Sequence, residues 1–378
     1  MNNKIEYEEI SPYVFVTKLA GFEHSEYIQP NATKIPMNTT DIPMVQGKNI
    51  RGGEFVEKYD WYIKKEISGS LPRSILNKRC ILIPYVGSNL GEVGIFPNKY
   101  VCHLASNIAK VELNSDKYLL EYMKYYMQSP IGQSYLFRAK QGSSQPNITM
   151  ESIRKTKIIK KSINEQIKIV SILSSIDAQI KRNNDMVQKL QVLTHSAFDY
   201  FSKHNNYENK IALNDIIVEK NKSQIQVNNI IDGSGDIPFF TSGESILYTD
   251  NSLTNGFNIF LSTGGNAKVQ SYYGNVSYST DTWCITSKNN LQYYLYGYLK
   301  HIENQMDKLY FHGTGLKHLQ KPLFLKSIIE IPNNSVIQKF NLIVEPMYIQ
   351  ISKLTQSNVK LQRLKNKLLP LLINQQLL

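Results

Sequence analysis

The sequence predicts an α+β fold, with two pseudo-symmetric globular domains separated by two long antiparallel coiled-coil helices. Three observations predict it. Four blocks of sequence occur twice in the same order, each copy has a strand-rich half followed by a helical half, and both helical halves carry a heptad pattern in the same phase. With 378 residues, the chain is long enough for two or three domains with cores of their own.

The strand-rich halves provide the first evidence for the repeat. "VGSNLGEVGIFPNKYVCHLASNIAKVELN" (86–114) and "STGGNAKVQSYYGNVSYSTDTWCITSK" (262–288) share a rhythm of glycines, alternating apolar residues and a cysteine. Because four ordered matches do not arise easily by chance, we expect a duplicated unit. The recurring blocks are 41–47 with 236–243, the amphipathic helices 118–127 with 293–302, 140–158 with 311–329, and the blocks that begin at 163 and 334.

Two long helices are predicted over residues 163–203 and 334–375, because apolar residues recur there at alternating spacings of three and four. Each helix would be about 60 Å long. Pro346 lies inside the second pattern and is expected to kink or split that helix near its first turns. The predicted seam contains Ile169, Leu173, Ile176, Ile180, Asn183, Val187 and Leu190 in the first helix, and Val344, Ile351, Leu354, Asn358, Leu361 and Leu368 in the second.

Two asparagines interrupt the apolar seam. If the helices pair antiparallel with their midpoints together, Asn183 lies opposite Asn358, and such a polar pair fixes the register at some cost in stability. In the alternative interpretation, both asparagines are solvated residues on the flank of the seam.

The composition favours a cytoplasmic protein that binds a polyanion. Lys and Arg number 43 against 31 Asp and Glu, which gives a formal net charge of +12. The chain has no apolar run of about 18 residues, and its N-terminus lacks the layout of a signal peptide, so we expect neither membrane insertion nor export. Cys80, Cys102 and Cys284 are too far apart for a CxxC site and are expected to be reduced and mostly buried.

No sequence pattern predicts a catalytic residue or a metal site. Gly47-Lys48 lacks the rest of a phosphate-binding P-loop, the glycines of "GSNLGEVG" (87–94) do not open a helix, and no HExxH motif occurs. The expectation is a binding protein with no cofactor in this chain.

Cationic and polar residues of the strand-rich halves, and of the loops that follow them, are instead candidates for contact with nucleic acid. Lys and Arg neutralise phosphates, whereas Asn, Gln, Ser, Thr and Arg can contact base edges. The alternatives are an ordinary solvated charge for each lysine and a tight turn for each loop. The candidate DNA-binding residues are Lys34, Lys48, Arg51, Lys58, Arg73, Lys78, Arg79, Ser88, Asn89, Gln141, Ser143, Ser144, Gln145, Thr241, Ser242, Asn266, Lys268, Thr314, Lys317 and His318.

The first helical half is preceded and opened by a set of residues that recurs in part in the second: Gly142-Ser143-Ser144 leading to Ile158, then Glu165-Gln166, Ile169, Leu173, Asp177 and Ile180. The second copy keeps Gly313-Thr314, Gln338 and Ile351, but it has Ile337 in place of the glutamate and a neutral residue in place of the aspartate. In these residues, and in its order of domain, helix, domain and helix, the chain resembles a specificity subunit of a type I restriction-modification system over essentially its whole length.

The resemblance implies target-recognition domains at 1–160 and 205–332, a central conserved helix at 161–204 and a C-terminal conserved helix at 333–378. Each domain would read one half of a bipartite site in double-stranded DNA. The helices would set the spacing and dock two methyltransferase (modification) subunits, and restriction/translocase subunits would complete the complex. This chain would have no catalytic residue. S-adenosylmethionine would belong to the methyltransferase subunit, and ATP and Mg to the restriction subunit.

Two alternatives belong to other functional classes. A structural nucleic-acid-binding scaffold would use the paired helices for assembly and bind without sequence readout. It would lose its affinity steeply with salt, whereas a sequence-specific reader keeps a large preference. A compact single-chain nuclease would cleave DNA with a metal ion and no partner.

Overall fold

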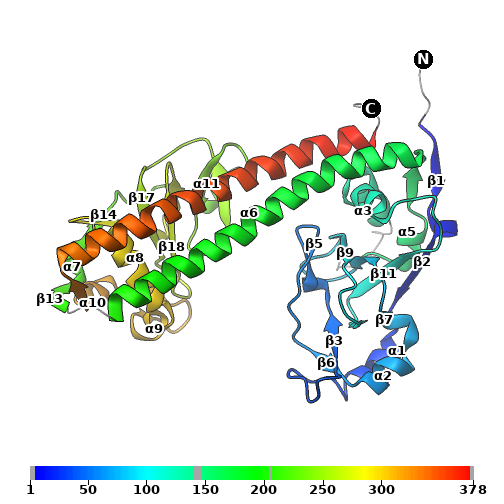
Figure 1. The fold of residues 1–378 in the computed structure, drawn as a ribbon, viewed down its shortest axis with the longest axis horizontal. Helices are drawn as coiled ribbons and strands as arrows, with labels where there is room; N and C mark the ends of the chain where they lie inside the picture. The colour runs from blue at the N-terminus through cyan, green and yellow to red at the C-terminus, as the bar shows by residue number, and fades with distance from the viewer. Residues whose placement is uncertain (1–4, 139–146, 204–206, 375–378) are drawn as a thin grey trace. The chain divides into compact units, whose positions relative to one another are not determined.

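The computed structural model describes residues 5–138, 147–203 and 207–374, and contacts divide the chain into two units. The first unit comprises Met1–Asp177 and Leu364–Leu378, and the second comprises Ala178–Arg363. Helix α6 (Ile163–Lys203) and helix α11 (Asn334–Ile373) each contribute one stretch to both units (Figure 1). The bounds of both helices agree closely with the sequence prediction. No helix in the described residues is long and apolar enough to cross a membrane.

Each unit contains a four-stranded antiparallel sheet, and the strand order is the same in both. The first sheet has the order β2-β11-β8-β9 and the second has the order β14-β20-β17-β18. The predicted repeat is therefore a repeat of topology. The strands are β2 (Val14–Lys18), β8 (Cys80–Pro84), β9 (Gly94–Phe96) and β11 (Ile108–Leu113), and β14 (Ile217–Glu219), β17 (Phe257–Ser262), β18 (Val269–Tyr273) and β20 (Thr282–Ser287).

The smaller sheets repeat as well. Strands β3 and β10 pair parallel in the first unit, as β15 and β19 do in the second, and the strand before each long helix pairs antiparallel with an early strand of its copy. These strands are β1 (Tyr7–Glu9), β3 (Ile42–Val45), β10 (Cys102–Leu104), β12 (Lys157–Ile159), β13 (Tyr207–Ala212), β15 (Ile237–Phe240), β19 (Ser277–Tyr278) and β23 (Ile328–Pro332). Short strands are β4 (Ile50–Arg51), β5 (Glu54–Phe55), β6 (Tyr62–Ile63), β7 (Ile75–Leu76), β16 (Ile246–Thr249), β21 (Phe311–His312) and β22 (His318–Leu319).

The shorter helices occupy matching places in the two copies. Helix α3 (Leu120–Gln128) corresponds to α8 (Gln292–His301), and both lie where the amphipathic pattern predicts them. The other matched pairs are α4 (Pro130–Leu136) with α9 (Glu303–Leu309) and α5 (Met150–Arg154) with α10 (Lys321–Leu325). The remaining helical turns are α1 (Gly21–Glu23), α2 (Lys65–Ser70), α7 (Leu213–Ile216), η1 (Ser11–Tyr13), η2 (His24–Ile28), η3 (Gly47–Asn49), η4 (Pro72–Ser74) and η5 (Val227–Asn229).

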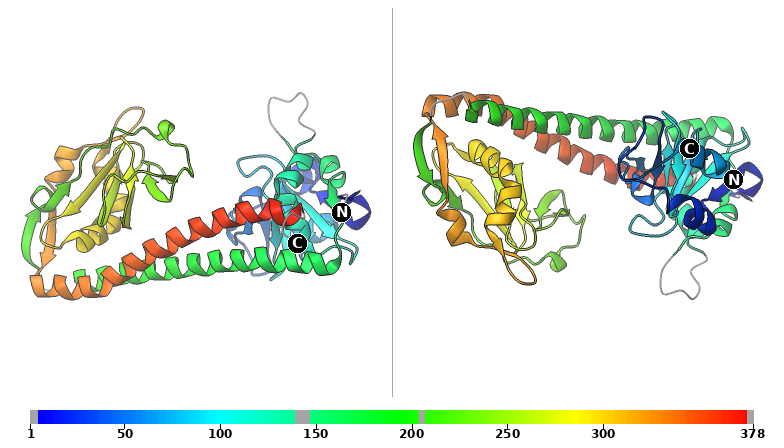
Figure 2. Two further views of the ribbon diagram at one scale, coloured as in Figure 1. Left: turned by 90° about the horizontal axis from the view of Figure 1, so that it is seen from above. Right: turned by 90° about the horizontal axis from the view of Figure 1, so that it is seen from below.

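In the second unit, α8 lies between the sheet and the long helices (Figure 2). Gly297 of α8 permits this close approach, because a Cβ atom there would lie 2.5 Å from the ring of Phe198 on α6. On the same helix Tyr293 packs on Phe257 of β17, with ring centroids 4.5 Å apart, and stacks on Tyr348 of α11. Helix α8 thus joins the sheet to both long helices through aromatic contacts.

The two long helices pair antiparallel. In the second unit, Phe201 packs against Phe340 with ring centroids 5.6 Å apart, and the Asn183 amide donates a 2.8 Å hydrogen bond to Oδ1 of Asn358. Asn183 is only 4% exposed, so the asparagines meet inside the seam and do not lie on a solvated flank. Every residue of the predicted seam is buried or half-buried.

The start of α6 explains the Glu-Gln motif. Ser162 and Glu165 cap the helix reciprocally, since the Ser162 N–H donates to the Glu165 carboxylate at 2.8 Å and the Glu165 N–H donates to the Ser162 hydroxyl at 3.3 Å. Gln166 is fully buried and donates to the carbonyl of Lys117. In the second copy Gln338 is exposed, whereas Ile337 is only 2% exposed. Ile337 therefore occupies the buried position that Gln166 holds in the first copy, and Gln338 is not the counterpart of Gln166.

Pro346 does not split α11, which runs as one helix from Asn334 to Ile373. Proline removes one backbone N–H and leaves the carbonyl of Leu342 without its helical partner. Leu342 is 77% exposed, so water can satisfy that carbonyl and the helix continues. The expected split was wrong because the proline lies on the solvent-facing side.

A buried ionic cluster joins the helix stretches of the first unit. Asp177 lies 2.6 Å from the Lys365 ammonium, 3.4 Å from that of Lys124, and accepts a 2.7 Å hydrogen bond from Tyr125. Burial alone would raise the pKa of Asp177, but the two ammonium groups and the hydrogen bonds outweigh it and hold this pKa below its usual value. Burial lowers the pKa of Lys365, and its pairing with Asp177 opposes that change.

The three cysteines are free and buried, as predicted. Burial raises the pKa of Cys80, Cys102 and Cys284 to about 12 in each case. They are therefore protonated, unreactive thiols of the two cores.

We predict that Gly297→Ala destabilises the second unit. A methyl group at this position would collide with Phe198, and overpacking costs about 1–3 kcal/mol, more than the helix propensity gained from alanine. Gly69→Ala is the matched control, because a Cβ there meets nothing within 4 Å and should stabilise slightly. Thermal unfolding followed by circular dichroism measures both. Equal melting temperatures for the two variants would contradict the predicted contact.

We also predict that Asp177→Asn lowers the free energy of unfolding by about 3–5 kcal/mol, because the buried Lys365 ammonium loses its carboxylate and Lys124 keeps only Glu54. Since the pKa of Asp177 is lower in the folded state, its contribution is present above the unfolded pKa and is lost as pH falls through the folded pKa. The variant should therefore lose less stability on acidification. Asp185→Asn, on the exposed side of α6, is the control and should change unfolding by about 0.5 kcal/mol or less. Equal free energies of unfolding for Asp177→Asn and Asp185→Asn would show that the cluster does not stabilise the first unit.

Candidate nucleic-acid interface

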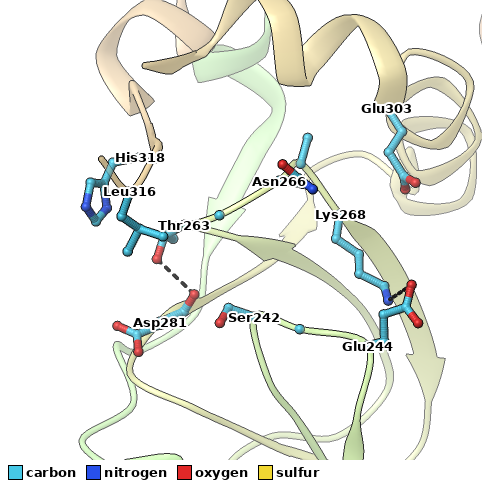
Figure 3. A pocket seen from close by; sticks show the side chains of 13 residues that line it. Ser242, Glu244, Thr263, Asn266, Lys268, Asp281, Glu303, Leu316 and His318 are labelled. Carbon is cyan, nitrogen blue, oxygen red and sulfur yellow. Dashed lines mark hydrogen bonds and ion pairs between the residues drawn. The ribbon is translucent and has the colours of Figure 1, made fainter. Parts of the chain in front are cut away.

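Loops from three hairpins of the second unit form an open hollow of about 590 Å³ (Figure 3). The hairpins are β15–β16, β17–β18 and β21–β22, and the hollow lies where their turns meet. It brings together four residues that the sequence predicted separately, namely Ser242, Asn266, Lys268 and His318.

Hydrogen bonds hold the loops around this hollow. The Thr263 hydroxyl donates to the Asp281 carbonyl at 2.8 Å (Figure 3), and the N–H of Gly265 donates to the Lys317 carbonyl at 2.9 Å. Gly265 has a φ of +80°, a left-handed conformation that favours glycine. The Ser262 hydroxyl donates to the carbonyl of Asn266. The loop therefore presents its side chains from a fixed backbone.

Asp307 links the β17–β18 hairpin to the β21–β22 hairpin. Its carboxylate accepts a 2.8 Å hydrogen bond from the backbone N–H of Ala267 and a 3.0 Å hydrogen bond from the Lys317 ammonium. These two bonds lower the pKa of Asp307. Lys317 thus supports the loop of Asn266 through this carboxylate, in addition to being half-exposed itself.

The charge of the hollow is mixed. Lys268 lies 3.8 Å from Glu244, and Asp281 and Glu303 also line the site. Such a surface offers donors and acceptors side by side, which suits contact with base edges better than attraction to phosphate alone. These three carboxylates and Thr263 were not predicted as site residues, because none belongs to a recognisable motif and only the hairpin arrangement brings them together.

The corresponding loops of the first unit also gather predicted residues. The turn after β3 carries Lys48 and Arg51, and the β8–β9 loop carries Ser88 and Asn89. The Asn89 amide donates to the Ile50 carbonyl at 2.7 Å, which fastens the two segments to one another. In both units, therefore, the same two topological positions hold candidate residues, with different side chains.

Other predicted cations lie away from these loops. Lys78 and Arg79 precede β8, whereas the Asn89 loop follows it, so the strand separates them. Lys78 pairs with Glu112 at 3.1 Å and Arg79 with Glu121 at 2.5 Å. These contacts support an ordinary surface role for both residues.

The remaining candidates differ in exposure. Thr241 is 8% exposed and its hydroxyl donates to the Ser245 carbonyl, so it stabilises a turn. Lys34 lies over the ring of Trp61, with Nζ 5.7 Å from the centroid, and Lys48 forms an ion pair with Asp60. Exposed residues without an ion pair among the described residues are Arg51, Lys58, Arg73, Ser88 and Thr314. Gln141, Ser143, Ser144 and Gln145 lie outside the described residues.

Comparison with protein families decides the identity of this fold. The model of the type I restriction modification DNA specificity domain matches twice, over residues 31–192 and 206–356. The chain belongs to this specificity-subunit family. The two matches coincide with the two copies of the repeat, and the specificity-subunit resemblance of the sequence is confirmed.

One solved structure shows the same fold, and two others are also similar to this chain. The type I restriction-modification S subunit from M. genitalium is 15% identical, with a TM-score of 0.61, and the match covers 99% of this chain and 97% of that one. The HsdS subunit from Thermoanaerobacter tengcongensis is 12% identical with a TM-score of 0.38, over 99% and 97% of the two chains. A structure described as showing complex assembly and conformational transition of the type I R-M system is 12% identical with a TM-score of 0.41, over 98% of both chains. The comparison with curated proteins gave no match.

Proposed function

We propose that each unit of this specificity subunit reads one half of a bipartite site in double-stranded DNA. The observation that carries the proposal is the placement of candidate residues in equivalent loops of two units with the same topology. Because these loops carry different side chains, the two half-sites should differ. The Ser88 hydroxyl in the first unit and the Asn266 amide in the second are exposed to base edges, and nearby cations are available to phosphates.

The paired helices would set the spacing between the half-sites and dock the methyltransferase subunits. Exposed apolar residues on these helices support a docking role, since Val192 is 65% exposed, Leu193 52%, Leu342 77% and Ile343 42%. Two methyltransferase subunits and the restriction/translocase subunits are the proposed partners. S-adenosylmethionine would be held by the methyltransferase subunit, and ATP and Mg by the restriction subunit. This chain would contribute recognition and no catalytic residue.

The proposal is tested by co-expressing this chain with its methyltransferase subunit and mapping methylated adenines by single-molecule sequencing. A split motif with two unlike halves and a nonspecific spacer is the expected result. A stable complex that methylates no defined motif would favour the alternative, a structural scaffold that binds nucleic acid without sequence readout. Methylation or cleavage by this chain alone would contradict its proposed non-catalytic role.

A single substitution distinguishes the two units. We predict that Asn266→Ala relaxes one half of the motif and leaves the other half unchanged, because the loss of one amide contact to a base costs about 1–3 kcal/mol of discrimination. Lys288→Ala is the control, since Lys288 is exposed and follows β20, whereas the hollow lies before that strand. The same methylation map measures both variants. Relaxation of both halves by Asn266→Ala, or an equal effect of Lys288→Ala, would refute the assignment of this loop.

A further inference from the structure

Two histidines and an aspartate converge in the second unit, away from the loops described above. His195 and Asp199 are one helical turn apart on α6, and His301 is the last residue of α8. One ligand atom from each residue lies within 4.8 Å of the other two. The group forms no motif in the sequence, because His301 is far from the other two residues along the chain.

The distances within the group are close to those of a metal site. Nε2 of His195 lies 3.7 Å from Oδ2 of Asp199, and Nδ1 of His301 lies 3.3 Å from Oδ1. Ligands of a tetrahedral zinc ion are 2.0–2.2 Å from the metal and therefore roughly 3.3 Å from each other. The ligand nitrogens of His195 and His301 lie within 4.8 Å of each other, and both side chains are about half exposed, at 49% and 47%.

One oxygen of the Asp199 carboxylate lacks a hydrogen bond of good geometry, although His301 lies 3.3 Å from it. Oδ1 of Asp199 is buried and accepts no hydrogen bond within the described residues. In that part of the chain, neither imidazole has a hydrogen-bond or ionic partner other than Asp199. An unsatisfied buried carboxylate oxygen costs free energy, which a bound cation would recover. The position of this carboxylate between two imidazoles that have no other hydrogen-bond or ionic partner in the described residues points to a ligand.

The shared fold does not require these residues. A shift of 171 positions relates the two copies of the long helices, and it places Asn366 at the position of His195 and Pro370 at that of Asp199. The offset of 175 that relates residues 118–127 to 293–302 places Tyr126 at the position of His301. The first copy forms the same topology without any of the three ligands, so the group is a feature of the second copy alone.

We propose that His195, Asp199 and His301 bind a divalent transition-metal ion, Zn²⁺ being the best match to two imidazoles and one carboxylate. Water would complete a tetrahedral set. The ion fastens α6 to the end of α8, next to the contact between Phe198 and Gly297. Since the folded chain binds the ion and the unfolded chain offers no preformed site, binding stabilises this junction.

The test uses the full-length chain, freed of any polyhistidine tag and treated with a chelator. Titration calorimetry with ZnCl2 measures affinity and stoichiometry, and CoCl2 provides a visible absorption spectrum that reports tetrahedral coordination. We expect one ion per chain and a higher melting temperature in its presence. His195→Ala and His301→Ala should each weaken zinc binding on the order of 100-fold or more. Loss of a residue that only hydrogen-bonds to a metal ligand already lowers metal affinity about 10–100-fold.

Two further variants make the result decisive. Asp199→Asn keeps the shape of the side chain and removes its charge, so it should weaken binding even if a histidine variant folds poorly. His312→Ala is the control, because His312 pairs in register with His318 across the β21–β22 hairpin and offers a competing histidine pair. Absence of zinc binding, equal binding by all variants, or loss of binding only in His312→Ala would each overturn the proposal.

Discussion

Each unit closes its core with residues from both long helices, and the rest of the structure depends on this shared use of α6 and α11. In the first unit, Ile169 and Leu173 of α6 join Leu369 and Leu372 of α11 in one apolar cluster with the sheet. In the second, Phe198 of α6 packs in the same cluster as Phe340 of α11. Each such side chain contributes about 1.5–3 kcal/mol on burial. Neither core is complete without both helices, so the helix pairing is part of each domain and more than a spacer.

The two copies stabilise the same junction by different chemistry. In the first unit Tyr125, Asp177 and Lys365 form a polar cluster. The long-helix shift of 171 positions places Tyr348 at the position of Asp177, and its ring meets that of Tyr296 on α8 edge to face with centroids 5.5 Å apart. The ionic version is costly to break and demands a specific partner, whereas the aromatic version depends on packing. The loss of the aspartate noted in the sequence is therefore a change of interaction and not a defect.

Local patterns in the sequence were sufficient to predict the helices, the repeat and the buried cysteines. The heptad spacing is a property of neighbouring residues, and it placed Asn183 within reach of Asn358 once antiparallel pairing was assumed. The repeat gave two equivalent domains because copies of one sequence adopt one topology. The exposed side of α11 was harder to predict, since the heptad pattern alone did not show that the carbonyl freed by Pro346 faces solvent.

The candidate site could be predicted only in part, because its residues are brought together by strand pairing. The sequence named Asn266 and His318 separately, but their convergence requires the hairpins β17–β18 and β21–β22 to lie side by side. Residue type alone could not distinguish Lys268 from Lys78. Lys268 lines the hollow, whereas Lys78 precedes β8 and so lies at the end of that strand away from the Asn89 loop. Glu244 and Asp281 were missed for the same reason, since acidic residues do not stand out in a search for cations.

The discontinuity of the first unit has a consequence for synthesis of the chain on the ribosome. Asp177 and the sheet of this unit are made early, but Lys365, Leu369 and Leu372 are made only after the whole of the second unit. Until then the first core lacks the apolar side chains that α11 contributes, and the Asp177 carboxylate lacks one of its two cations. The second unit has all of its residues before the first unit does. The order in which the domains can be completed is therefore the reverse of the order in which they begin.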